Sequence, residues 1–116
     1  MAMSELKEEV VKSANNELNR ANEKFPLFNS EHEGIAVIWE EFEESKEALE
    51  ELEASTRCLW DHVRGKETPC FLKETIKPPT IADIALNLAC EAIQTAAMFM
   101  KYEMSLGAEA KEPESE

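Results

Sequence analysis

A cluster of glutamates offers the clearest candidate chemistry in this sequence. The segment WEEFEES contains Glu40, Glu41, Glu43 and Glu44. On a helix, residues three or four positions apart share a face, so Glu40 and Glu41 both neighbour Glu44 whereas Glu43 points elsewhere. Grouped carboxylates suit hard divalent cations, and a carboxylate beside like charges is a candidate general base because its pKa is raised. A solvated acidic face is the competing interpretation.

Glu91 is the most informative single residue. It lies in TIADIALNLACEAIQTAAMFMKY, where Asp83, Asn87, Glu91 and Gln94 follow one another at intervals of four, four and three in an otherwise apolar stretch. A helix that is apolar nearly all round is buried, and a buried carboxylate is costly unless it is paired or bound to metal. Glu91 therefore binds a metal, pairs with Lys or Arg from another helix, or faces solvent with the rest of its stripe.

Two glutamates on one helix and one on another would make an oxygen cage in a helical bundle. Carboxylate oxygens suit Mg²⁺ or Mn²⁺, with water and substrate phosphates completing the octahedron. A di-iron carboxylate site would need Glu-x-x-His on facing helices. Position 94 is Gln, and neither His32 nor His62 has a glutamate three residues before it. The sequence therefore favours Mg²⁺ or Mn²⁺ over a di-iron centre.

Helical periodicity predicts the elements that position these residues. A first helix is expected over 4–24, with Ser4 as N-cap and an end at Phe25-Pro26, because the residue before proline leaves helical geometry. A second is expected over 30–64, opened by a capping box of Ser30 and Glu33. A third is expected from Thr80, as N-cap, to about residue 104.

The second helix carries a coiled-coil-like seam, whose positions alternate three and four apart: Ile35, Ile38, Phe42, Ser45, Leu49, Leu52, Thr56, Leu59 and Val63. At 1.5 Å per residue the helix would be roughly 50 Å long, which exceeds the diameter of a domain of this size. It therefore either breaks near 54–56 or leaves part of its seam for a partner. The predicted fold is an all-α antiparallel bundle of three helices, or four with the break, whose core is completed in a homodimer or homotetramer.

Length and composition limit the classes of protein to which this chain can belong. The 116 residues predict one domain over 1–105, with a linker or lid at 65–80 and an acidic, disordered tail at 106–116. The net charge of −13 disfavours nucleic acids and anionic membranes as partners. No signal-peptide pattern opens the chain, and Cys58, Cys70 and Cys90 show no paired spacing. We expect reduced thiols, no membrane partner and a cytoplasmic location.

The segments HEGIAVIWEEFEESKEALEEL, LWDHV and ALNLACEAIQTAAMFMKY resemble MazG-like proteins of the all-α nucleoside triphosphate pyrophosphohydrolase superfamily, in its short phage and bacterial branch. The resemblance covers roughly residues 30–104. The family motif is Glu-Glu-x-x-Glu on one helix and Glu-x-x-Asp on the next. Glu40, Glu41 and Glu44 match the first half and Glu91 opens the second, but Gln94 stands where the family has Asp. The interval 45–90 is also longer than the family's usual spacing.

The resemblance implies Mg²⁺-dependent hydrolysis of a nucleoside triphosphate to monophosphate and pyrophosphate. It implies catalytic roles for Glu40, Glu41 and Glu44, and a metal site of Glu41, Glu44, Glu91 and Gln94. Lys101 is a candidate phosphate contact, or else a surface lysine near a helix end. His32 and Trp39 are candidate contacts to the base, with Trp39 alternatively in the core or an interface. The alternative function is a non-catalytic helical oligomer, an interaction or regulatory module: Gln94 favours it, whereas Glu91 favours the enzyme.

Overall fold

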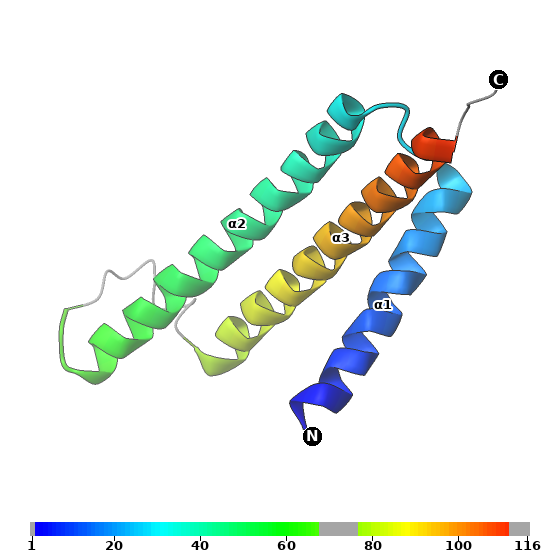
Figure 1. The fold of residues 1–116 in the computed structure, drawn as a ribbon. Coiled ribbons are helices and arrows are strands. Elements are labelled where there is room, and N and C mark those ends of the chain that lie inside the picture. Colours follow the sequence, from blue (N-terminus) through cyan, green and yellow to red (C-terminus); the bar gives the residue numbers. More distant parts are fainter. Residues whose placement is uncertain (1, 68–76, 112–116) are drawn as a thin grey trace. The chain divides into compact units, whose positions relative to one another are not determined.

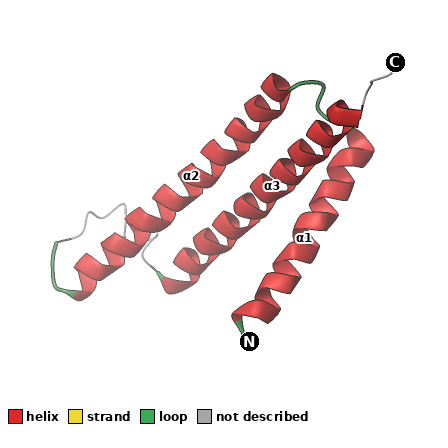
Figure 2. Cartoon of the chain, viewed as in Figure 1, coloured by secondary structure: helices red, strands yellow, loops and turns green. Residues whose placement is uncertain are grey.

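A computed structural model describes residues 2–67 and 77–111 of the chain. Over these residues the protein consists of three α-helices and contains no strand: α1 (Met3–Lys24), α2 (Glu31–Val63) and α3 (Pro78–Lys111) (Figures 1 and 2). The predicted all-α class is confirmed. Most of the predicted linker or lid, Cys70 and the last five residues of the predicted tail lie outside the described residues.

The first helix begins and ends close to the predicted positions, but with a different cap. The N-cap is Ala2, so the prediction of Ser4 is wrong. The Glu5 side chain supplies the cap instead, because its Oε1 accepts a hydrogen bond of 3.0 Å from the Ala2 N–H. At the other end Phe25 is extended, with φ −135° and ψ 146°, as the following proline requires.

The second helix is capped nearly as expected and does not break. Ser30 Oγ accepts a hydrogen bond of 3.1 Å from the Glu33 N–H. The Glu33 carboxylate in turn accepts one of 2.6 Å from the Asn29 N–H, one residue earlier than a standard capping box has it. The helix continues through 54–56 to Val63. Gly65 follows with φ 83°, the left-handed conformation that glycine adopts readily after a helix.

The third helix is longer at both ends than the sequence predicted. It begins at Pro78, so Thr80 lies inside the first turn and is not the N-cap. Proline is tolerated there because the N–H groups of a first turn have no partner within the helix. The helix ends at Lys111. Residues 106–111, predicted to belong to a disordered tail, are therefore helical, and alanine-rich GAEAK favours this.

Contacts divide the chain into two compact units. One comprises Met1–Phe42 with Ala92–Glu116, and the other comprises Glu43–Glu91. The core of the first contains Ala14, Leu18, Ile38 and Ala97, and that of the second contains Cys58 and Ile84. The single domain expected over residues 1–105 stays a prediction.

The buried face of α2 is rotated relative to the predicted seam. Ile38, Ser45, Leu52 and Leu59 are buried or half-buried, as predicted. The other half of the seam is exposed, and its place is taken by the preceding residues Gly34, Glu41, Ala48 and Ser55. Small residues let helices approach closely: a Cβ on Gly34 would overlap the Tyr102 ring of α3. Ile35, Phe42, Leu49 and Val63 are left exposed as a result. We call these four residues the exposed α2 stripe.

The apolar helix α3 is also largely exposed in the single chain, contrary to the expectation that it is buried all round. Leu86 is 63% exposed and Phe99 is 51% exposed, because the neighbouring helices cover only part of its surface. By length and composition, Pro78–Gly107 meets the criterion for a membrane-crossing helix, which core helices of soluble proteins also meet.

Candidate active site

In the unit formed by Glu43–Glu91, the structure brings the carboxyl groups of Glu44 and Glu91 together. Glu44 belongs to α2 and Glu91 to α3. Burial raises the pKa of Glu91, and the charge of Glu44 and a side-chain hydrogen bond with Glu44 raise it further. A hydrogen bond between two carboxyl groups needs one shared proton. A cation placed between the two carboxyl groups would relieve the same repulsion.

The four polar residues of α3 that the sequence groups into one stripe do not share one environment. Glu91 is half-buried, whereas Asp83, Asn87 and Gln94 are exposed. Glu91 lies in line with Ile84, Leu88 and Thr95, which are buried or half-buried. The apolar stretch therefore places Glu91, alone among the four polar positions, on the packed side of α3.

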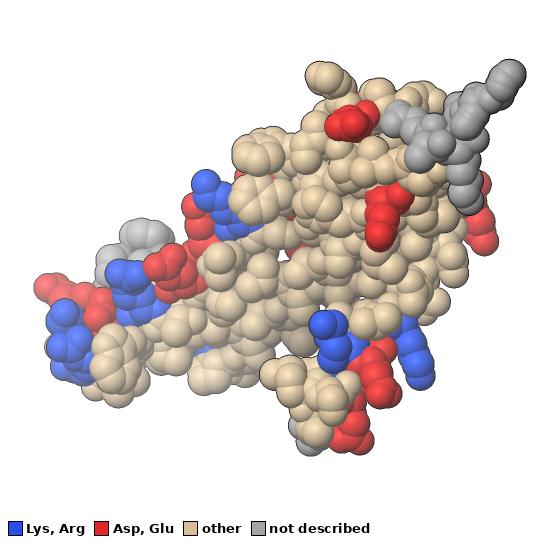
Figure 3. Space-filling model, in the orientation of Figure 1, with Lys and Arg blue, Asp and Glu red and all other residues tan. Residues whose placement is uncertain are grey.

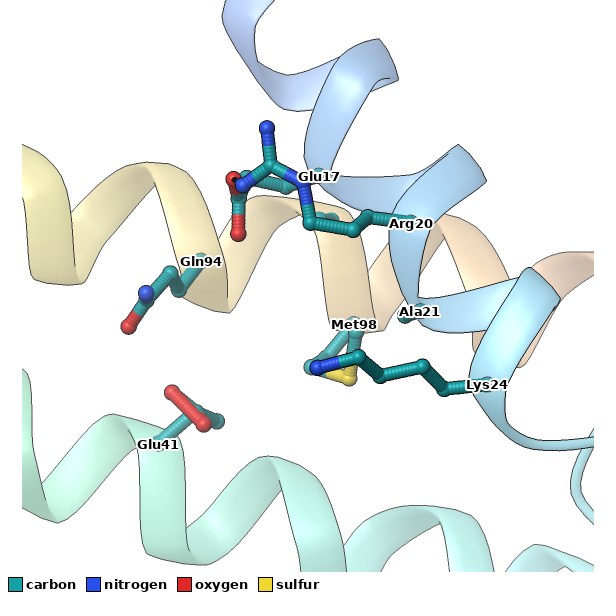
Figure 4. Close-up of a pocket in the computed structure, with 8 residues that line it drawn as sticks. Glu17, Arg20, Ala21, Lys24, Glu41, Gln94 and Met98 are labelled. Carbon is teal, nitrogen blue, oxygen red and sulfur yellow. Dashed lines mark hydrogen bonds and ion pairs between the residues drawn. The ribbon is translucent and has the colours of Figure 1, made fainter.

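In the other unit, Glu41 and Gln94 line a cavity of about 200 Å³. Their side chains point toward one another from α2 and α3 (Figure 4). Thr95, next to Gln94, donates a hydrogen bond of 3.3 Å from its Oγ1 to the backbone carbonyl of Glu41 and so ties the two helices at this level. Glu41 is half-buried, whereas the neighbouring Glu40 is exposed.

Arg20 and Lys24 of α1 line the same cavity (Figure 4), and the sequence analysis missed them. Four residues apart, they share one face of the helix. Arg20 also forms an ion pair with Glu17. Guanidinium and ammonium groups are the usual protein partners of phosphate oxygens. The only signal in the sequence was this i, i+4 pair of cations, a pattern that is equally typical of a solvated surface.

The donor set of Glu44 and Glu91 fits Mg²⁺ or Mn²⁺. Within residues 2–67 and 77–111, no group of three or more His, Cys, Asp or Glu side chains is placed to hold a metal. Mg²⁺ does not need such a group, because it commonly binds one or two protein carboxylates and completes its octahedron with water and substrate phosphates. The adjacent carboxyl groups of Glu44 and Glu91 meet that requirement.

The remaining predicted site residues fall in different surroundings. His32 is exposed in the first turn of α2. Trp39 is 55% exposed, so it is not a core residue, and its ring packs against Phe42 with centroids 5.2 Å apart. Lys101 is only 3% exposed, which shows that the interpretation as a surface lysine is wrong. It lines another cavity, together with Phe25 and Phe28.

The chain was compared with models of protein families, with curated proteins and with solved structures, and none of these comparisons gave a match.

Proposed function

We propose that the protein is a MazG-like pyrophosphohydrolase, which uses Mg²⁺, or Mn²⁺ in its place, to hydrolyse a nucleoside triphosphate to the monophosphate and pyrophosphate. The observation that carries the proposal is the carboxyl pair of Glu44 and Glu91, with the raised pKa of Glu91. Two carboxylates held together at the cost of mutual repulsion are typical of a cation site. The resemblance of residues 30–104 to the family supports the same function.

Glu44 and Glu91 are the proposed core of the metal site. Glu41 precedes Glu44 by three residues on α2, and Gln94 follows Glu91 by three residues on α3. The resemblance to the family would assign both as additional ligands, Gln94 through its carbonyl oxygen or a bound water. When bound, Mg²⁺ neutralises phosphate charge and lowers the pKa of a coordinated water.

The other roles belong to side chains around the cavity of Glu41 and Gln94. Arg20 and Lys24 supply the positive charge that an acidic protein needs to hold a triphosphate. Glu41 is the proposed general base, because among Glu40, Glu41 and Glu44 it alone is half-buried and lines this cavity. In this position its carboxylate would accept the proton of an attacking water.

Pyrophosphate release measured over a panel of ribo- and deoxynucleoside triphosphates tests the proposal. With Mg²⁺ or Mn²⁺, we expect release from at least one nucleotide. Glu44→Gln should abolish it, because a neutral amide is a weak partner for a hard cation. Glu43→Gln is the matched control: it removes one charge from an exposed neighbour on α2 and should retain the parent rate. Absence of release from every nucleotide with either metal would refute the proposed activity.

The exposed α2 stripe favours the second candidate function, a helical oligomer that acts as an interaction or regulatory module. Ile35, Phe42, Leu49 and Val63 recur every seven or fourteen residues and are 43–70% exposed. On the face drawn in Figure 3, uncharged residues occupy most of the central surface. A heptad-spaced apolar stripe is typical of helix pairing, so we propose a homodimer or homotetramer under either function. An oligomer that never releases pyrophosphate would favour the module.

A further inference from the structure

A cavity of about 460 Å³ lies beside the loop that joins α1 to α2. Its apolar wall includes Phe25, Phe28, Val37 and Met98, and its charged groups are Glu33 and Lys101. Pockets of this size and mainly apolar lining, with a few polar groups, are typical of small-molecule sites. Ala21 and Met98 also line the cavity of Glu41 and Gln94. The two cavities therefore adjoin within the same unit.

Lys101 is the unusual group in this cavity. The residue is only 3% exposed, and its Nζ lies over the rings of Phe28 and Phe25, 5.1 Å and 6.0 Å from their centroids. Burial lowers the pKa of Lys101, and the charge of Glu33 partly opposes this effect. No ion pair within 4.0 Å joins the two side chains in the described part of the chain. Among the described residues its partners are therefore the faces of the Phe25 and Phe28 rings, and none of its N–H donors is given an oxygen acceptor.

We infer that this cavity binds the base of the nucleotide and selects a base with a ring N–H beside an exocyclic carbonyl, above all guanine. The inference rests on the proposed function, which places the triphosphate in the adjoining cavity of Arg20 and Lys24. Lys101 donates to the carbonyl oxygen, and the Glu33 carboxylate accepts from the ring N–H. Apolar side chains of the cavity wall, among them Val37 and Met98, contact the base.

Guanine fits this pair of charged groups better than adenine. Guanine offers O6 and N7 as acceptors, the usual partners of Lys and Arg, and its N1–H and amino group are donors for a carboxylate. Adenine has no carbonyl oxygen for Lys101 and is typically read by the amides of Asn or Gln. Lys101 and Glu33 both line the cavity and form no ion pair within 4.0 Å in the described residues.

Calorimetric titration of the full chain with GMP and with AMP, without metal, tests the inference. We expect GMP to bind at least about tenfold more tightly than AMP, because one well-placed pair of hydrogen bonds to a base edge discriminates between bases by about this factor. Lys101→Met and Glu33→Gln should each abolish this preference. Lys101→Met removes a buried charge and nearly keeps the volume, so we expect it to melt no lower than the parent. Glu33→Gln keeps an oxygen that can accept from the Asn29 N–H.

Equal affinities for GMP and AMP, or a preference that survives Lys101→Met, would overturn the inference. Binding of inorganic pyrophosphate that is lost in Lys101→Met would also overturn it, because Lys101 would then be a phosphate contact. Failure of the proposed function gives a different result. Glu44→Gln should lose pyrophosphate release and keep the GMP preference. A GMP preference without hydrolysis refutes only the hydrolase, whereas hydrolysis without a base preference refutes only this cavity's role.

Discussion

Glu91→Gln is the sharpest test of the metal site, because the two interpretations of Glu91 predict opposite changes. In the metal-free protein Glu91 is half-buried beside Glu44, and burial and the charge of Glu44 raise its pKa. Glutamine keeps the shape of the side chain and removes its charge. We therefore expect the metal-free variant to melt no lower than the parent. A buried ion pair with a lysine or arginine would give the reverse, because losing one partner of such a pair costs about 3–5 kcal/mol.

The same substitution should abolish the stabilisation by metal. A ligand that binds only the folded state adds about 2.7 kcal/mol at one hundred times its Kd. Loss of a direct carboxylate ligand should weaken metal binding at least about a hundredfold, since mutating a residue that only hydrogen-bonds a ligand already lowers metal affinity about 10–100-fold. At the same metal concentration, about 0.4 kcal/mol of stabilisation then remains. The parent should therefore gain on the order of 10 °C more than the variant on addition of metal.

Thermal melting with and without Mn²⁺, followed by circular dichroism, measures both effects. Glu43→Gln is the control, because Glu43 is exposed on α2 beside Glu44 and its substitution removes the same charge. It should keep the full response to metal. A Glu91→Gln protein that melts several degrees lower without metal, or that retains the parent's shift with Mn²⁺, would refute the assignment of Glu91 to a metal site.

Other features of the structure give further expected outcomes. Because the pKa of Glu91 is raised in the folded state, the folded parent binds a proton on this carboxyl group more tightly than the unfolded chain does. Its stability should therefore fall relative to that of Glu91→Gln as pH rises above about 4.5. Equal pH profiles of Tm for the two proteins would contradict this prediction. Gly34→Ala should destabilise by about 1–3 kcal/mol because the methyl group overlaps Tyr102. Gly107→Ala, with nothing within 4 Å, should instead stabilise by about 1 kcal/mol, and urea unfolding compares the two. Leu49→Glu, at an exposed apolar position, should shift light scattering toward the 13.1 kDa monomer; a parent that is already monomeric at micromolar concentration would refute the oligomer.

Local signals in the sequence predicted the helices well, because their causes are local. Phe25-Pro26 ends α1 through the geometry of the residue before proline. Ser30 caps α2 through its own hydroxyl. The prediction of Ser4 as N-cap was wrong because the N-cap lies two residues earlier, at Ala2, whose N–H donates to the carboxylate of Glu5. Alanine has no side-chain acceptor for the first-turn N–H groups, so the sequence does not mark it as an N-cap.

The site was only partly predictable, because its contacts join residues far apart in the chain. The cost of a carboxylate on an apolar helix singled out Glu91, and the structure does place it beside Glu44. Nothing local marked Lys101 as buried, since a lysine near the end of a helix is usually solvated. Arg20 and Lys24 line a cavity only because α1 packs beside α2 and α3 at that level. Burial of a charge depends on which helix covers it, and helical periodicity does not contain that information.

The rotation of α2 lets one helix carry both the proposed active site and the proposed partner surface. A seam of large residues would have placed Ile35, Phe42 and Leu49 inward. In the structure the inward positions are Gly34, Glu41 and Ala48. Small residues allow close helix packing, and Glu41 then reaches a cavity and not bulk solvent. The displaced apolar side chains stay exposed, and covering them requires another surface. Having Gly, Glu and Ala on the inner face of α2 therefore favours both a half-buried carboxylate at the cavity and self-association through the exposed α2 stripe.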